Sequence, residues 1–232
     1  MKFKTKLKKY SDQTKLKNYE AVSLLSYDEF LANCSYDRIQ KILSKYELFK
    51  MIKNIPGDIV ECGVHKGSGI YLYAKLLKLF KPHSLTRVLG FDFFGERQKI
   101  KNKFLDDDLC NKFHRKRSIK KENIIKNLKK FDINNVKLIP GDVCQTSKNY
   151  VKKNIGFRIS MLILDVDNYE GTLACLNNFY PAITKGGIIV LDEYALETYG
   201  ESDAVDEFLK NKKMKLKSLS WCSTPSAYAI KI

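Results

Sequence analysis

Apolar residues in most of the chain fall into short runs that alternate with stretches of helical spacing. Five apolar runs have the length of a buried strand: 58–62, 87–92, 136–140, 159–165 and 187–191. Helical spacing is found at 68–80, 169–179 and 203–209, and two edge strands are expected near Leu216 and over 227–232. Strands that alternate with helices and consist of near-continuous apolar runs predict a mostly parallel sheet with helices on both faces.

A further helix precedes the first strand. Apolar residues recur at three- and four-residue spacing from Ile39 to Ile52, Ser35 offers an N-cap, and Pro56-Gly57 ends the pattern. Residues 1–34 are basic and irregular, with seven lysines by residue 17, and we interpret them as an arm or helical extension. Residues 35–232 then suit a single α/β domain.

One connection, from residue 93 to about 120, is much longer than the others and rich in charge. A connection of this length in a compact domain is usually a functional lid or a disordered segment. We interpret it as a lid or acceptor-binding loop.

Composition excludes several classes of protein. With 44% hydrophobic residues the chain can build a substantial core, and its apolar runs fall short of the ~20 residues that a membrane helix needs. No signal peptide is recognised, and the six cysteines form no C-x-x-C pair, so we expect reduced thiols in a cytoplasmic protein.

The formal net charge of +16 favours anionic partners, which include nucleic acid, nucleotide-linked substrates and an anionic membrane face. The lysines are scattered along the chain rather than gathered in one motif. Nucleic-acid binding therefore stays an alternative hypothesis and is not the one we favour.

Ligands of parallel sheets bind beyond the carboxyl ends of the strands, so the residues that follow each strand are the candidates for chemistry. The first strand runs into a glycine turn, 61–69. Gly63 and Gly67 would let the backbone approach a ligand, His65 would shape the pocket, and Ser68 opens a helix with free N–H groups. The G-x-G-x-x-G dinucleotide pattern is absent, which disfavours NAD.

Carboxylates follow the next two strands. Asp92 could accept hydrogen bonds from both hydroxyls of a ribose, or it could cap a turn. Gly141-Asp142 could meet an adenine amino group, although alone it would be an ordinary turn.

Four more carboxylates follow the fourth and fifth strands: Asp165, Asp167, Asp192 and Glu193. Neighbouring strands lie about 4.8 Å apart, so these groups can converge on one point. Three or four converging oxygens suit Mg²⁺. The alternative is that some of them cap helices while the others are solvated.

These motifs together resemble the macrocin O-methyltransferase family, over roughly residues 36–232. The residues that carry the resemblance lie at 55–64, 91–95, 164–172 and 192–194. The resemblance implies a Rossmann-like, seven-stranded class I methyltransferase sheet and S-adenosylmethionine as cofactor. It also implies Mg²⁺-assisted methylation of a sugar or nucleotide-linked sugar hydroxyl, in glycan or natural-product biosynthesis.

The resemblance also implies roles for single residues. Glu61 and Gly63 would line the methionine part of the cofactor, Asp92 in its Phe91–Gly95 motif the ribose, and Asp142 the adenine edge. Phe93, in the same motif, is expected in the cofactor site.

For the metal, the resemblance implies Asp165, Asp192 and Glu193 as ligands, and we expect Asp165 to face the cofactor as well. Two residues at this site depart from the family: Val166 stands where a small residue is usual, and Glu193 where an aspartate is usual. Residues 95–98 lack the usual acidic and proline-containing pattern, which leaves the acceptor open.

The acceptor hydroxyl must lose a proton, and Asp165, Asp167 and His114 are the candidates to take it. His114 precedes Arg115-Lys116-Arg117, a cluster that could hold a phosphate or simply be solvated. The rival functions are an RNA methyltransferase of the same fold and a non-catalytic cofactor-binding protein. The basic arm could also serve a partner subunit in a homo-oligomer.

Overall fold

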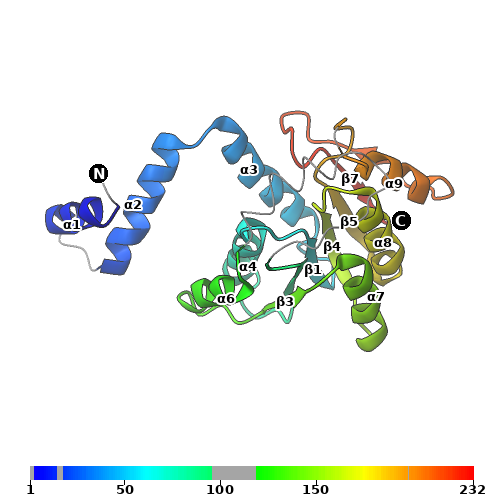
Figure 1. Ribbon diagram of the computed structural model, residues 1–232, viewed down its shortest axis with the longest axis horizontal. Coiled ribbons are helices and arrows are strands. Elements are labelled where there is room, and N and C mark those ends of the chain that lie inside the picture. The colour runs from blue at the N-terminus through cyan, green and yellow to red at the C-terminus, as the bar shows by residue number, and fades with distance from the viewer. Residues whose placement is uncertain (1–2, 15–17, 96–118, 198) are drawn as a thin grey trace. The chain divides into compact units, whose positions relative to one another are not determined.

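The computed structural model describes residues 3–14, 18–95, 119–197 and 199–232 (Figure 1). The chain forms two compact units, Met1–Ile39 and Gln40–Ile232. The first contains α1 (Phe3–Thr14), α2 (Asn18–Asn33) and the start of α3 (Tyr36–Met51). Within it, Lys6 Nζ lies 2.7 Å from Glu29 Oε1, an ion pair that is too exposed to contribute more than about 1 kcal/mol.

The second unit is built on one seven-stranded sheet in the order β3-β2-β1-β4-β5-β7-β6. Its strands are β1 (Asp58–Cys62), β2 (Val88–Asp92), β3 (Val136–Pro140), β4 (Ile159–Leu164), β5 (Ile183–Leu191), β6 (Leu216–Lys217) and β7 (Ala227–Ile230). The first five pair in parallel, whereas β7 runs antiparallel to both β5 and β6. The predicted seven-stranded, mostly parallel, Rossmann-like sheet is confirmed.

Helices cover both faces of this sheet (Figure 1). The helices beyond α3 are α4 (Ser68–Phe80), α6 (Lys121–Lys129), α7 (Val143–Lys153), α8 (Tyr169–Phe179) and α9 (Glu201–Leu209), with a 3₁₀ turn at Tyr180–Ala182. Side chains of α3, α4 and α6 form one core with the sheet, and those of α7, α8 and α9 form the other. Every residue of β1 and β4 is buried, as a strand covered on both faces requires.

The apolar pattern did not predict two of these helices. In α6 only Ile124 and Leu128 are buried, and in α7 only Ser147 and Tyr150 are, so each presents a thin apolar stripe. β5 also begins earlier than predicted, because an irregularity in its pairing with β4 includes Gly186 and Gly187, which interrupt the apolar run.

The strand order locates the binding crevice. From β1 the chain moves to one side for β2 and β3, then returns to the other side of β1 for β4 and β5. The point where the direction changes lies between β1 and β4, and ligands of such sheets bind outside the carboxyl ends of the strands there. Among the described helices, none is both long enough and apolar enough to span a membrane.

Candidate functional site

The turn after β1 has a backbone that requires glycine. Gly63 has a φ of +89° and Gly67 a φ of +85°, both in the left-handed region. A Cβ on Gly63 would lie 1.6 Å from the carbonyl oxygen of Asp165, at the end of β4. The two strand ends on either side of the switch point are therefore in close contact, and no side chain separates them.

Asp92, predicted to take a ribose, fixes this turn. Its Oδ2 accepts hydrogen bonds from the backbone N–H groups of Val64 and His65, both at 2.8 Å, and its Oδ1 accepts one from Phe94 at 3.3 Å. The carboxylate thus connects the end of β2 to the glycine turn after β1. Its contact with a ribose stays a prediction.

Gly141 and Asp142 begin the connection after β3. The Gly141 N–H donates to the carbonyl of Asp92 at 2.9 Å, which brings the two predicted adenosine residues side by side. Asp142 Oδ1 accepts from the backbone N–H of Cys144 at 2.9 Å and caps α7. Asp142 therefore has a structural role as the N-cap of α7, and its contact with adenine stays a prediction.

Glu61 lies on β1 and is only 2% exposed. Its Oε1 is 3.5 Å from Lys45 Nζ, and both side chains are buried. The Oε2 atom has no hydrogen-bond partner within the part of the chain that the structure describes. Burial raises the pKa of Glu61, and the Lys45 ammonium opposes that rise.

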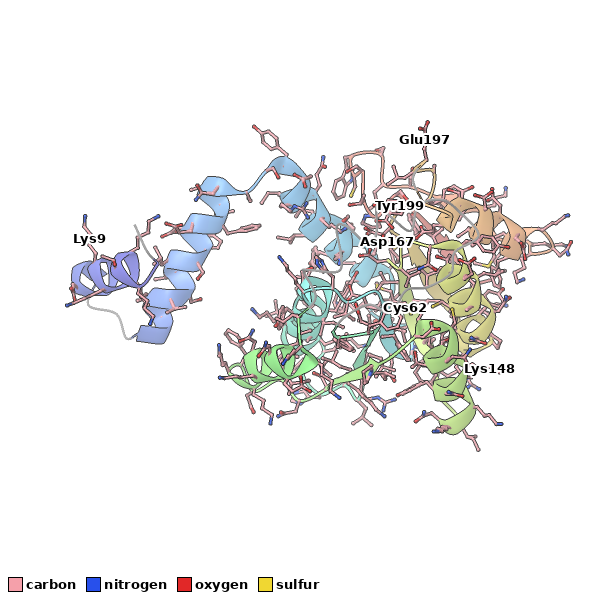
Figure 2. All side chains as sticks on the ribbon, in the orientation of Figure 1. Lys9, Cys62, Lys148, Asp167, Glu197 and Tyr199 are labelled. Carbon is pink, nitrogen blue, oxygen red and sulfur yellow. The ribbon has the colours of Figure 1, made fainter. Side chains whose placement is uncertain are left out.

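The predicted metal carboxylates do not all meet. One oxygen each of Asp165, Asp167 and Glu193 lies within 4.8 Å of the others. Asp192 is not in this group, and its Oδ2 accepts from Lys41 Nζ at 2.7 Å. The structure therefore brings together two of the three predicted ligands and adds Asp167, whose backbone is left-handed with a φ of +57°. Cys62, the last residue of β1, and Asp167 are labelled in Figure 2.

The carboxylates of this cluster repel one another. Burial and the neighbouring Asp192 and Asp167 carboxylates raise the pKa of Asp165 well above its usual range. Burial, with Asp167 and Asp165, raises the pKa of Glu193 to about 12. Such groups hold protons or a cation rather than bare negative charge.

Two lysines of α3 that were not predicted pair with carboxylates of the site, Lys41 with Asp192 and Lys45 with Glu61. Lys41 and Lys45 are four residues apart and so lie on one face of the helix. Burial acts to lower the pKa of Lys41, but the Asp192 and Asp165 carboxylates outweigh it and the pKa is raised. The four-residue spacing of the two lysines was visible in the sequence, but nothing there indicated that this face would meet the strand ends.

A third unpredicted residue supports Glu193. Glu201, the first residue of α9, is fully buried, and its Oε1 accepts from the Glu193 backbone N–H at 3.0 Å. Burial raises the pKa of Glu201 to about 8.

The remaining predicted residues are placed as follows. Ser68 is the first residue of α4, directly after Gly67, and Phe93 is half-buried directly after Asp92. His65 is exposed in the turn. His114 and most of the predicted lid, residues 96–118, lie outside the described residues.

Comparison with known proteins places this arrangement in a family. The model of the macrocin O-methyltransferase (TylF) family matches residues 35–225. Demethyldecarbamoylnovobiocin O-methyltransferase of Streptomyces niveus is 28% identical over 160 residues, which are 67% of this chain and 59% of the relative. An 8-demethyl-8-(2,3-dimethoxy-alpha-L-rhamnosyl)-tetracenomycin-C 4'-O-methyltransferase of Streptomyces olivaceus is 27% identical and covers 66% of this chain and 63% of its own length. The chain thus spans about three fifths of the length of these two curated relatives.

Solved structures share the fold. The calicheamicin methyltransferase CalS11 superposes with a TM-score of 0.77 at 22% identity, covering 98% of this chain and 90% of that one. The O-methyltransferase NovP superposes with a TM-score of 0.70 at 22% identity, covering 83% of this chain and 80% of that one. Together with the family model, which matches most of the chain, these findings confirm the family predicted from the motifs. The chain belongs to the macrocin O-methyltransferase family.

Proposed function

We propose that the protein is an S-adenosylmethionine-dependent O-methyltransferase that methylates a hydroxyl group of a sugar or nucleotide-linked sugar in glycan or natural-product biosynthesis. The observation that carries the proposal is the carboxylate cluster beside a glycine turn, at the switch point of a sheet from this family. The two curated relatives are named as O-methyltransferases, one of a rhamnosyl compound. All five described cysteines are free thiols, which supports a reducing, cytoplasmic location.

The cofactor would lie across the carboxyl ends of β1 and β2. Glu61 Oε2, buried without a partner among the described residues, would accept from the ammonium group of the methionine part. The glycine turn, with Gly63, His65, Gly67 and Ser68, would let the backbone approach it closely. Asp92, with Phe93 next to it, would take the ribose, and Gly141-Asp142 the adenine edge.

The residues present also fit a divalent cation. Oxygens of Asp165, Asp167 and Glu193 are close enough to share one ion, and Glu193 Oε2 is buried with no hydrogen-bond partner among the described residues. These three would hold Mg²⁺, while Lys41 balances the charge of Asp192. When bound, the ion would supply Lewis-acid chemistry that lowers the pKa of acceptor hydroxyls.

The chain's own residues then position and deprotonate the acceptor. Methyl transfer is an in-line displacement at a sulfonium, so fixing the two reactants in line accounts for much of the rate. Asp167, a member of the carboxylate cluster, is one candidate for the group that receives the hydroxyl proton. Asp165 and His114 remain candidates.

Transfer of a radiolabelled methyl group from S-adenosylmethionine to a panel of nucleotide-linked sugars and deoxysugar glycosides tests the function. We expect at least one sugar to be labelled, and labelling to stop in excess chelator. Labelling of RNA but of no sugar would favour the nucleic-acid alternative. Failure to bind S-adenosylmethionine would favour the non-catalytic one.

The raised pKa of Glu193 gives a second prediction, which needs no acceptor. With its pKa at about 12, Glu193 holds its proton at pH 7 to 8, and a cation must displace that proton to bind. Binding of Mn²⁺ should therefore release protons, and its affinity should rise by up to about tenfold per pH unit for each proton released.

Calorimetric titration with Mn²⁺ in two buffers of different ionisation enthalpy measures the number of protons released. Glu193→Gln is the matched variant, since it keeps the shape of the side chain and has no proton to release at this position. A metal affinity that does not change from pH 6 to pH 8 in the unmodified protein would contradict the prediction.

A further inference from the structure

The opposite edge of the sheet carries a hollow, far from the carboxylate cluster. It has a volume of about 810 Å³ and lies where β1, β2 and β4 begin. Three connections line it, with residues from 53–58, 81–87 and 153–158. Since β1 has five residues at about 3.3 Å each, roughly 15 Å of strand separates the hollow from the glycine turn.

Positive charge dominates the lining of this hollow. Its five cationic side chains are Lys53, Lys81, Arg87, Lys153 and Arg158. Among the lining residues that the structure describes, Asp58 is the single carboxylate. In the part of the chain that the structure describes, no ion pair is found for any of the cations except Arg87.

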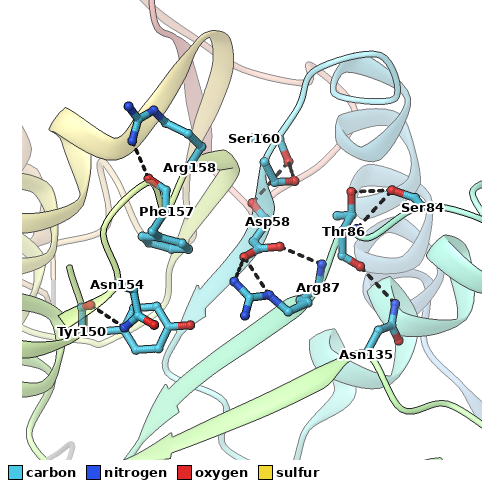
Figure 3. Close-up of polar contacts among 11 residues, drawn as sticks. Asp58, Ser84, Thr86, Arg87, Asn135, Tyr150, Asn154, Phe157, Arg158 and Ser160 are labelled. Carbon is cyan, nitrogen blue, oxygen red and sulfur yellow. Dashed lines mark hydrogen bonds and ion pairs between the residues drawn. The ribbon is translucent and has the colours of Figure 1, made fainter. Parts of the chain in front are cut away.

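The one carboxylate is fully engaged with the one paired cation. Asp58 Oδ2 accepts from Arg87 Nε at 3.1 Å and from a terminal guanidinium nitrogen at 2.6 Å, and Oδ1 accepts from the Arg87 backbone N–H at 2.8 Å (Figure 3). The buried acid therefore holds the guanidinium of Arg87 in a fixed orientation. It leaves four positive charges around the hollow without a counter-charge from the lining.

The positive field extends beyond the hollow. Lys231 has its pKa lowered by burial and by the charge of Arg158, one of the lining residues. A concave surface lined by charges of one sign raises the local concentration of ions of the opposite sign.

We propose that this hollow binds a nucleotide that carries a diphosphate or triphosphate group. The four positive charges without an ion pair among the described residues match the negative charge of two or three adjacent phosphates. Arginine and lysine are also the side chains that commonly bind phosphate. The volume falls within the range of small-molecule sites, about 300 to 1,000 Å³. Leu85 and Ile155, 95% and 100% exposed, offer apolar surface at the same hollow for the organic part of the ligand.

Such a ligand would leave the catalytic crevice open, because it binds at the other ends of the strands. The proposal is independent of methyl transfer. A protein that fails every methyl-transfer assay would still be expected to bind the nucleotide.

The test is calorimetric titration with ATP and with inorganic tripolyphosphate at 0.15 M salt, in the presence of saturating S-adenosylhomocysteine. That compound occupies the proposed adenosine site, so heat from a second ligand reports a different site. We expect both probes to bind, and ATP more tightly than tripolyphosphate because of the apolar surface.

Two neighbouring lysines give a matched control. Lys152 and Lys153 are both exposed in the last turn of α7, but only Lys153 lines the hollow. We expect Lys153→Glu and Arg158→Glu to weaken ATP binding at least tenfold and Lys152→Glu to change it less than threefold. Affinity for S-adenosylhomocysteine should stay unchanged in all three, which also reports correct folding.

Three outcomes would overturn the proposal. No binding of either probe at millimolar concentration excludes the site. Equal losses in Lys152→Glu and Lys153→Glu would mean that the net charge of the protein attracts the anion, not the hollow. Tighter binding of a 20-nucleotide RNA than of ATP, lost steeply with salt, would assign the surface to nucleic acid.

Discussion

Replacing Asp165 with asparagine is expected to lower the rate of methyl transfer by about a thousandfold or more, and to change the affinity for S-adenosylmethionine less than about threefold. Asp165 directly follows β4, and the Asp192 and Asp167 carboxylates both act on it. Its loss would remove one oxygen of the proposed cation site and one candidate proton acceptor. The asparagine side chain keeps the shape and leaves the glycine turn undisturbed.

The measurement pairs turnover of the labelled sugar with calorimetry of the cofactor. Asp203→Asn on the exposed side of α9 is the matched control, since it makes the same chemical change outside the carboxylate cluster. Asp165→Asn with more than a tenth of normal turnover would remove Asp165 from the proposed catalytic machinery. Loss of cofactor binding in the same variant would instead place Asp165 in the cofactor site.

Replacing Gly63 with alanine is expected to destabilise the fold by at least about 4 kcal/mol, a loss that also abolishes cofactor binding. Two effects add at this position. The φ of +89° is unfavourable for any residue with a Cβ, and that Cβ would lie 1.6 Å from a backbone oxygen of Asp165. Because the obstacle is backbone, it cannot move aside as the end of a flexible side chain could.

Gly156→Ala separates the two effects. Gly156 has a similar φ of +81°, but a Cβ there would meet no atom of the described residues within 4 Å. The conformational cost alone is about 1 to 2 kcal/mol, so urea unfolding should show this smaller loss for Gly156→Ala. Equal losses of unfolding free energy in the two alanine variants would mean that the close approach of Gly63 to the Asp165 backbone adds nothing to the conformational cost.

Much of the fold could be predicted because a strand that is buried on both faces has mostly apolar residues, which the sequence shows. β1 and β4 are buried on both faces and are therefore mostly apolar in sequence, and the groups that follow parallel strands must lie at one edge of the sheet. Gly63 and Asp92 were identified from this rule alone. The helices α6 and α7 are mostly polar, with two buried residues each, and they were missed.

The partners of the site residues were harder to predict. Asp92 was expected to meet a ligand, but nothing in the spacing showed that it also fixes the turn after β1. Asp192 and Glu193 are adjacent in sequence but have different partners. Lys41 donates to Asp192, whereas Glu193 joins the cluster with Asp165 and Asp167. Contacts of this kind depend on how α3 packs across the strand ends, and its own residues do not determine that packing.

The position of β7 has a consequence for how the protein is made. β7 lies between β5 and β6, yet it follows both of them along the chain. During synthesis β5 therefore has one side unpaired until residues 227–230 have left the ribosome. An apolar edge with free N–H and C=O groups is a template for wrong pairing between nascent chains, so we expect expression to depend on chaperones that shield this strand.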